Sequence, residues 1–541
     1  MTEPDWDFII VGAGSAGCVL ADRLVSAGRR VLLLEAGTRD RDPWIHIPLG
    51  FGRIRQKRLH DWGYLSEPQS ALDSRSIEIR RGKVIGGSSS INAMVHVRGH
   101  RTDFDRWAAG GLDGWSFDEV LPSFIEQECW EGPASGLRGT SGPLNVRESR
   151  YQDPLTEAVI DAAISSGHPL SEDYNGKEQH GVGRLQFTIR AGRRCSAASA
   201  FLSRVAGHDN LRVRTGVLVT SLVIEGNRAV GVEFVAGGLS QRARAAAEVV
   251  LCAGVINSPQ ILMLSGIGDP SELQQHGIKV RHALPGVGRN LQDHPMMPLA
   301  FERAGAGSMQ RHMRADRIAF DLALAAIAGR GFATDIPSPL AAFLKTDPAL
   351  VAPDIQVMLH GAPVSALPYL WPWRRAWPDG FSMLVTLLRP RSRGSLSLRD
   401  NNPASPMRIQ TALLTDPRDR SDLVKGFELV REIAAAPALK PFIRSHAGLD
   451  PGDHSPQTLE AYLRARAGTV HHPAGTCRMG VASDDLAVVD RDLRVLGIEG
   501  LRVVDASAMP DLVGGNINAA VMMIAWRAAR AILHHPRPTL S

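Results

Sequence analysis

The order of hydrophobic and polar positions predicts that the chain opens with a strand–helix–strand unit. Residues 8–11 form a short apolar run, which is typical of a strand buried on both faces. Residues 18–25 follow with the spacing of an amphipathic helix. A second apolar run at residues 31–34 predicts another buried strand, which ends at Glu35. This alternation predicts a mixed α/β fold.

Glycines between the first strand and the helix have the spacing of a dinucleotide-binding turn. Gly12 allows a tight turn, Gly14 lets the backbone approach a pyrophosphate, and Gly17 lets helix and strand pack closely. Glu35 stands eighteen residues after Gly17, where a carboxylate can accept hydrogen bonds from a ribose. Because an acid disfavours a phosphorylated ribose, the unit predicts FAD or NAD rather than NADP.

A second loop of small residues, 81–92, offers backbone donors to a flat ligand. Small side chains permit close approach of the ligand, and Asn92 can both donate and accept hydrogen bonds. By itself this composition is also consistent with a flexible loop.

Bulk composition excludes several classes of protein. A chain of 541 residues is too long for one hydrophobic core, so we expect at least two domains. The net charge of +5 is modest and no dense basic run interleaves with aromatics, which argues against nucleic-acid binding. No apolar stretch reaches the roughly 18–20 residues of a membrane span, and the first strand leaves no room for a secretory leader. The five cysteines are odd in number and lack metal-ligand spacing, so we expect reduced thiols, a cytoplasmic location and no metal.

These motifs, with others further along, closely resemble those of the glucose–methanol–choline (GMC) family of FAD-dependent oxidoreductases. The resemblance covers nearly the whole chain, and its motifs occur in the family's order. The residues that carry it are 82–92, 254–268, 284–294, 389–395, 472–476, 503–507 and 515–518. Choline-dehydrogenase-like enzymes are the most similar group.

The resemblance implies two domains. A discontinuous, Rossmann-like FAD-binding domain would comprise residues 1–150, 206–295 and 462–541. Residues 151–205 and 296–461 would form a substrate domain with an antiparallel sheet and flanking helices. In support of that sheet, residues 211–214 and 229–234 alternate like strands with one exposed face.

The same resemblance identifies the cofactor as FAD. In the family, the valine matching Val219 meets the adenine through its backbone, and the acid matching Asp505 lies near the pyrophosphate. Some relatives attach FAD through a histidine just before the loop asparagine. Here that position is Ile91, so we expect non-covalent FAD. The expected cofactor contacts are Gly12, Gly14, Ser15, Ala16, Gly17, Glu35, Ala36, Val84, Gly87, Ser88, Asn92, Ala93, Met94, Val95, Val219, Asp505, Ala506 and Asn518.

The chemistry of alcohol oxidation directs attention to the C-terminal residues. Flavin N5 can take a hydride, so the protein must supply a base and hold the substrate oxygen. His472 matches the family's catalytic histidine, and Asn516 matches the partner that would hydrogen-bond the substrate oxygen. On an extended segment His471 would point away from the flavin, and Asn518 would contact the flavin ring.

We therefore predict oxidation of a primary alcohol to an aldehyde, with electrons passed to oxygen or a quinone-type acceptor. Choline, aryl and aliphatic alcohols, polyethylene glycol and pyridoxine all stay open as substrates, as does the oligomeric state. A flavin-binding relative without alcohol turnover, or a flavin photoenzyme acting on carboxylic acids, is the alternative.

Two further features stay open. Residues 367–378 alternate aromatics and prolines, with two arginines between them. This stiff apolar segment is consistent with a lid over the substrate, with a peripheral contact to a membrane or quinone, or with a packed surface loop. His96 stands where relatives usually carry an aromatic residue, and we interpret it as packed or surface-exposed rather than catalytic.

Overall fold

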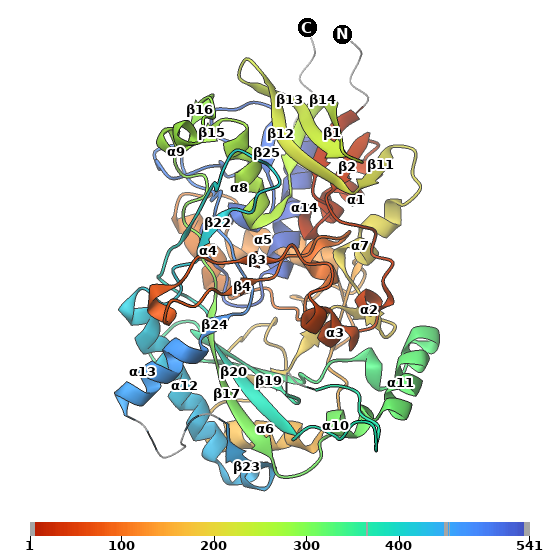
Figure 1. The fold of residues 1–541 in the computed structure, drawn as a ribbon, viewed down its shortest axis with the longest axis vertical. Helices are drawn as coiled ribbons and strands as arrows, with labels where there is room; N and C mark the ends of the chain where they lie inside the picture. The colour runs from red at the N-terminus through yellow and green to blue at the C-terminus, as the bar shows by residue number, and fades with distance from the viewer. Residues whose placement is uncertain (1–5, 364–365, 448, 450–452, 454, 535–541) are drawn as a thin grey trace.

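The computed structural model describes residues 6–363, 366–447, 449, 453 and 455–534. Two seven-stranded sheets lie toward opposite ends of the molecule, and both described chain ends lie beside the first sheet (Figure 1). Helices and irregular segments join and cover the sheets, giving the predicted mixed α/β fold.

The first sheet is built around the predicted opening unit. Its strand order is β11-β2-β1-β14-β13-β12, with β25 paired to β14. The predicted strands are present as β1 (Trp6–Val11) and β2 (Val31–Glu35), which pair in parallel on either side of α1 (Ser15–Ser26) in sequence. The other strands are β11 (Leu211–Thr215), β12 (Val217–Glu225), β13 (Arg228–Ala236), β14 (Leu239–Leu251) and β25 (Leu501–Val503).

The structure corrects the prediction that the alternating residues 211–214 and 229–234 support an antiparallel substrate sheet. Residues 211–214 belong to β11, which pairs in parallel with β2, and residues 229–234 belong to β13, which pairs with β12 and β14. Both strands are therefore in the first sheet and give no support for the antiparallel substrate sheet. Alternation reports one solvated face, but it does not say which sheet a strand joins.

In the second sheet every pair of neighbouring strands is antiparallel. The strand order is β23-β17-β20-β19-β18-β7, with β24 paired to β17. Its strands are β7 (Gly181–Arg184), β17 (Pro295–Arg303), β18 (Leu340–Leu344), β19 (Ile355–His360), β20 (Gly380–Leu387), β23 (Ile443–His446) and β24 (Gly468–Thr469). The long helix α12 (Pro417–Ala435) packs against β17, β19 and β20, and α6 (Pro154–Ser165) packs beside it.

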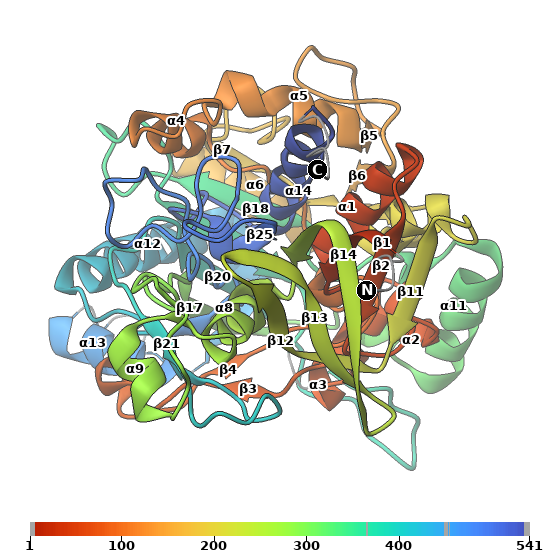
Figure 2. The same ribbon diagram turned by 90° about the horizontal axis from the view of Figure 1, so that it is seen from above.

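Further helices and short strands complete the fold. Helices α1 and α14 pack against each other close to the first sheet (Figure 2). Among the described residues, no helix is long and apolar enough to cross a membrane.

The other helices are α2 (Pro43–His46), α3 (Gly50–Lys57), α4 (Arg101–Ala109), α5 (Phe117–Gln127), α7 (Ala197–Ala200), α8 (Gly254–Leu264), α9 (Pro270–Gln275), α10 (Ser308–His312), α11 (Ala315–Ala328), α13 (Pro456–Arg466) and α14 (Asn518–His534). Short strands are β3 (Tyr64–Leu65), β4 (Glu78–Ile79), β5 (Glu128–Trp130), β6 (Leu144–Glu148), β8 (Gln186–Phe187), β9 (Ile189–Arg190), β10 (Arg193–Arg194), β15 (Ile267–Gly268), β16 (His282–Ala283), β21 (Ser395–Ser397) and β22 (Arg408–Gln410).

Candidate functional site

One cavity of about 1040 Å³ extends from the first sheet to the second. At one end it is lined by Gly12 and Gly14 of the turn after β1. At the other end it is lined by Met358 and His360 of β19 and by Leu384 of β20. Residues far apart in sequence thus share a single space that has room for both a cofactor and a substrate.

Close backbone packing shapes the end near the first sheet. Gly12 has φ +101°, and a Cβ atom there would lie 2.5 Å from the Cys252 carbonyl oxygen. The two glycine loops meet at Gly87, where a Cβ would lie 2.7 Å from the Gly14 Cα. Gly14 is the N-cap of α1 and provides no side-chain cap, so the first N–H groups of the helix are available to a phosphate. These features fit the pyrophosphate of FAD.

Two buried acids flank this end. Glu35 accepts hydrogen bonds from the backbone N–H groups of Ala13 and Gly37, both at 2.8 Å, and burial raises its pKa to about 7. Asp505 accepts hydrogen bonds from the Ser258 hydroxyl at 2.6 Å and the Gly254 N–H at 2.9 Å. Burial also raises the pKa of Asp505. Backbone and hydroxyl donors thus fix the positions of both carboxyl groups at the cavity wall.

Most residues predicted to contact FAD line this cavity, but Gly17, Val84 and Met94 do not. A Cβ on Gly17 would lie 1.9 Å from the Gly12 carbonyl oxygen, which explains the glycine as a packing requirement. Val84 is fully buried, and Met94 packs in a separate apolar cluster. The predicted residues that do line the cavity are Gly12, Gly14, Ser15, Ala16, Glu35, Ala36, Gly87, Ser88, Asn92, Ala93, Val95, Val219, Asp505, Ala506 and Asn518, together with His472 and Asn516.

His472 is held in place from the strand pair β17–β24. Pro295 of β17 pairs with Thr469 of β24, which brings the segments on either side of those residues together. Asp293 accepts hydrogen bonds from the His472 backbone N–H at 2.8 Å and the Thr469 hydroxyl at 2.5 Å. Burial raises the pKa of Asp293 to about 6.

A row of hydrogen bonds defines which nitrogen of His472 carries a proton. His294 Nε2 lies 3.0 Å from the Leu388 carbonyl oxygen, and because a carbonyl only accepts, Nε2 must donate. Burial lowers the pKa of His294 to about 4, so the ring is neutral near pH 7 and its Nδ1 is an acceptor. That atom lies 3.1 Å from His472 Nδ1, which therefore carries the proton. His472 is neutral as well, because burial lowers its pKa well below 6.5, so its Nε2 is unprotonated and can accept a hydrogen bond.

Asn516 completes this arrangement at the cavity. Its Nδ2 lies 3.1 Å from His472 Nε2 and donates to that atom. Gln356 Nε2 donates to Asn516 Oδ1 at 3.1 Å, which fixes the orientation of the amide. The predicted pair is thus in contact, with an unprotonated nitrogen of His472 and an N–H donor of Asn516 side by side.

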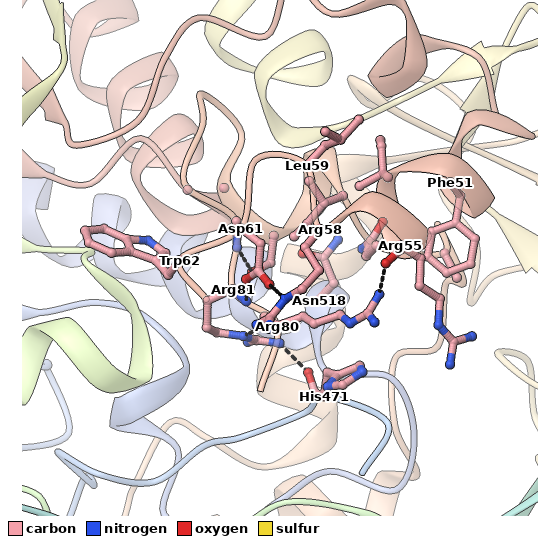
Figure 3. A pocket seen from close by; sticks show the side chains of 18 of the residues that line it. Phe51, Arg55, Arg58, Leu59, Asp61, Trp62, Arg80, Arg81, His471 and Asn518 are labelled. Atoms are coloured by element: carbon pink, nitrogen blue, oxygen red, sulfur yellow. Dashed lines mark hydrogen bonds and ion pairs between the residues drawn. The ribbon is translucent and has the colours of Figure 1, made fainter. Parts of the chain in front are cut away.

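His471 does not lie on an extended segment, contrary to the prediction from the sequence. Its φ is +65°, so this residue leaves the extended conformation, and both His471 and His472 line the cavity. Its carbonyl oxygen accepts a hydrogen bond from the Arg81 guanidinium, as Figure 3 shows. The alternation rule for extended segments therefore does not apply here.

His96 lies away from the cavity lining, in a buried cluster of charges. Its Nε2 lies 3.1 Å from Glu128 Oε1, and the same carboxylate binds Arg98 at 2.6 Å and Arg138 at 2.9 Å. This position agrees with the interpretation of His96 as a packed residue.

The aromatic segment at residues 367–378 is divided between the cavity and the surface. Leu367 and Pro368 line the cavity, whereas the side chains of Trp371 and Trp373 are 66% and 82% exposed. The apolar surface of these two tryptophans is therefore turned toward solvent.

Sequence reasoning missed several residues that line or adjoin the site. His294 ends one of the family motifs, but the sequence does not show its contact with His472, which depends on the β17–β24 pairing. Phe51 and Arg55 of α3 and His360 at the end of β19 line the cavity but stand in no recognisable motif.

Comparisons with known proteins agree with this architecture. Residues 6–296 and 390–525 match the sequence profiles of GMC oxidoreductases. The chain is 41% identical to the mitochondrial choline dehydrogenase of Homo sapiens, over 99% of this chain and 91% of that protein. It is 38% identical to the oxygen-dependent choline dehydrogenase of Photobacterium profundum, over 98% and 93% of the two chains.

Solved structures extend the likeness to the fold. Pyridoxine 4-oxidase from Mesorbium loti superimposes with a TM-score of 0.87 at 34% identity, covering 98% of this chain and all of the other. Formate oxidase from Aspergillus oryzae superimposes with a TM-score of 0.90 at 26% identity, over 97% and 98% of the chains. The profiles match more than half of the chain, and the relatives are matched over nearly their full length. The chain therefore belongs to the GMC oxidoreductase family, with choline dehydrogenases, which act on CH–OH groups, among its relatives.

Proposed function

We propose that this protein oxidises a primary alcohol to an aldehyde with non-covalently bound FAD, and that His472 is the base. The observation that carries the proposal is the pair of His472 Nε2 and Asn516 Nδ2, 3.1 Å apart at the cavity wall. The likeness to choline dehydrogenases and to pyridoxine 4-oxidase supports the reaction class.

The cavity residues described above would hold the cofactor. The N-terminus of α1 and the two glycine loops would bind the pyrophosphate, and Glu35 would accept hydrogen bonds from the ribose. Bound FAD would supply a hydride acceptor at its N5 atom. Ile91 lines the cavity beside Asn92 and has no nucleophilic atom, which supports reversible rather than covalent attachment.

His472 and Asn516 divide the work on the substrate hydroxyl. The hydroxyl would replace Asn516 as the donor to His472 Nε2, which takes the proton as the carbon loses a hydride. Asn516 Nδ2 donates to the hydroxyl oxygen and stabilises the negative charge that develops there. The alcohol thus gives up one proton and one hydride and leaves as an aldehyde.

We also propose the domain division and the electron acceptor. Residues 1–150, 206–295 and 462–541 would form the FAD-binding domain. In support, the first sheet takes its strands from residues 6–35, 211–251 and 501–503. Oxygen or a quinone-type molecule would remove the electrons, and the name of the Photobacterium relative supports oxygen.

Anaerobic mixing of the FAD-loaded protein with a panel of primary alcohols tests the proposal. Loss of flavin absorbance at about 450 nm is expected with at least one alcohol. His472→Ala should slow this bleaching at least about 100-fold, whereas His208→Ala, at an exposed position, should leave it unchanged. If none of the alcohols bleaches the flavin, or if His472→Ala does not slow the bleaching, the mechanism is refuted. Repeating the reaction in air and measuring peroxide identifies oxygen as the acceptor or excludes it.

A further inference from the structure

The carboxylates that line the cavity already have partners in the protein. Glu35 and Asp505 accept the backbone and hydroxyl hydrogen bonds described above. Asp61 lies 3.2 Å from Arg58 Nε and accepts a hydrogen bond from the Arg81 backbone N–H at 3.0 Å. Glu78 pairs with Arg80 at 2.8 Å and with Arg58 at 3.4 Å. Among the described lining residues, no carboxylate is left to receive a cationic substrate.

Most of the cationic lining residues are also engaged. Arg58 and Arg80 take part in the ion pairs just described. The guanidinium of Arg81 donates to the backbone carbonyls of Arg80 and His471 (Figure 3). Arg53 lies over the ring of Trp44, 5.2 Å from its centroid.

Arg55 is the exception. Within the described part of the chain, its guanidinium makes no ion pair and no side-chain hydrogen bond. It lies on α3 one turn after Phe51, so the two side chains share a helix face, and both line the cavity. Glu78 acts on Arg55 electrostatically, but this carboxylate already pairs with Arg58 and Arg80. A half-buried cation that shares its counter-charge in this way is costly unless a ligand supplies another.

The positive charge of Arg55 lowers the pKa of two histidines that line the cavity. Burial lowers the pKa of His360 to about 4, and the positive charge of Arg55 lowers it further. Burial also lowers the pKa of His471 to about 3, with contributions from Arg81, Arg80 and Arg55. Both imidazoles are therefore neutral near pH 7. The positive charge of Arg55 thus acts on His360 of the second sheet and on His471, which directly precedes His472.

The aromatic residues of the cavity do not form a site for a quaternary ammonium group. Such a group is recognised by several aromatic faces or by a carboxylate. The face of Trp62 is occupied by Lys83, whose Nζ lies 4.3 Å from the ring centroid, and Trp44 is occupied by Arg53. Phe51 is the remaining aromatic residue of the described lining, and it lies one turn from Arg55.

We propose that the alcohol oxidised at this site carries a carboxylate, and that Arg55 binds this group while the hydroxyl lies against His472. This inference rests on the proposed function and names its substrate class. The body of the substrate would be apolar, because aliphatic and methionine side chains form much of the remaining wall. These include Leu49, Met309, Met313, Ile318, Leu322 and Ile336.

Four matched alcohols test the inference by anaerobic stopped-flow reduction of the flavin. They are benzyl alcohol, 4-(hydroxymethyl)benzoate, a benzyl alcohol with a para-trimethylammonium group, and choline. We expect the Kd of the carboxylate to be at least about tenfold lower than that of benzyl alcohol, the size of a charge-assisted hydrogen bond. The Kd values of both cations should be higher than that of benzyl alcohol.

Substitutions at Arg55 separate charge from shape. Arg55→Gln should raise the Kd of the carboxylate at least about tenfold and change that of benzyl alcohol by less than about twofold. Arg55→Lys should give an intermediate value, and Arg55→Glu should favour the trimethylammonium alcohol. Lys57→Gln, on the same helix but exposed and outside the cavity lining, is the matched control and should change nothing. The ratio of flavin to protein verifies that each variant is folded and loaded.

A binding measurement distinguishes failure of this inference from failure of the proposed function. Terephthalate, which has no hydroxyl, should bind by titration calorimetry to the wild type and at least about tenfold more weakly to Arg55→Gln. Equal or tighter binding of choline or benzyl alcohol than of the carboxylate, or an Arg55→Gln variant with unchanged carboxylate affinity, overturns the inference. If terephthalate binds through Arg55 but no alcohol reduces the flavin, the anion site stands and alcohol oxidation is refuted.

Discussion

The Nδ1 atoms of His294 and His472 lie 3.1 Å apart, although the two residues are 178 positions apart in sequence. The His294 ring is fixed by donation from its Nε2 to the Leu388 carbonyl oxygen. Its Nδ1 can therefore only accept, and it selects the form of His472 that carries a proton on Nδ1. This contact leaves the other nitrogen of His472 unprotonated at the cavity, as a base requires.

Removing this acceptor should impair the proposed proton transfer. His294→Leu leaves His472 free to adopt the wrong tautomer, and we expect kcat to fall about 100-fold. Glutamine can both accept and donate, so His294→Gln should retain more activity than His294→Leu. Steady-state kinetics and flavin content of both variants provide the measurement. Equal losses in the two variants, with normal flavin content, would contradict a role in selecting the tautomer.

The pH dependence of kcat/KM follows from the pKa of His472. Burial, followed by the neighbouring His294, Arg81 and His471, lowers this pKa well below 6.5. The neutral imidazole is the active form, and protonation on the acid side removes the base. Since kcat/KM reports the free enzyme, it should stay level as the pH falls to 6.5 and decline only below that value. An acid limb centred above pH 6.5, with a substrate that does not titrate there, would show that His472 is not the group observed.

Short motifs predicted the parts of the site that depend on local geometry. The strand, turn and helix from β1 to α1 follow from apolar runs and glycines, and the positions of Gly14 and Glu35 at the cavity follow from them. Parallel strands end at the same edge of a sheet, so local pattern was enough for this end of the cavity.

Contacts between distant segments could not be predicted in the same way. His294 meets His472 because β17 pairs with β24, and no local pattern reports that pairing. Arg55 is one of many arginines in the sequence, and only the packing of α3 shows that its guanidinium lines the cavity without a direct ion pair among the described residues. The use of residues 211–214 as support for the substrate sheet fails for the same reason, since alternation does not identify a strand's neighbours.

Glu35 should contribute to cofactor affinity through its two backbone contacts. In Glu35→Gln, the amide can no longer accept from both Ala13 and Gly37, so one N–H of the turn loses its partner. We expect the Kd of FAD to rise about tenfold, measured by reconstituting apoprotein and following flavin fluorescence. Glu172→Gln, at an exposed position, is the control. Unchanged FAD affinity in Glu35→Gln would exclude this carboxylate from the ribose site.

Ile91 makes a simple prediction about the attachment of the cofactor. Its aliphatic side chain lines the cavity and also packs in an apolar cluster with Ile45, Ile54 and Val84. Because it has no atom that can form a bond to the flavin, acid precipitation should release all the flavin into the supernatant. Flavin fluorescence that stays with the protein band on a denaturing gel would contradict non-covalent binding.

Gly87 tests whether the two glycine loops must touch for the cofactor to bind. Its φ is +54°, and a Cβ atom would lie 2.7 Å from the Gly14 Cα, which is backbone and cannot rotate away. Gly87→Ala should therefore separate the loops and raise the Kd of FAD at least about tenfold, with a lower Tm for the loaded protein. Gly136→Ala is the matched control, because nothing lies within 4 Å of its Cβ position and its φ is not positive. If Gly87→Ala loads FAD as well as Gly136→Ala does, the contact between the loops is not what shapes the phosphate site.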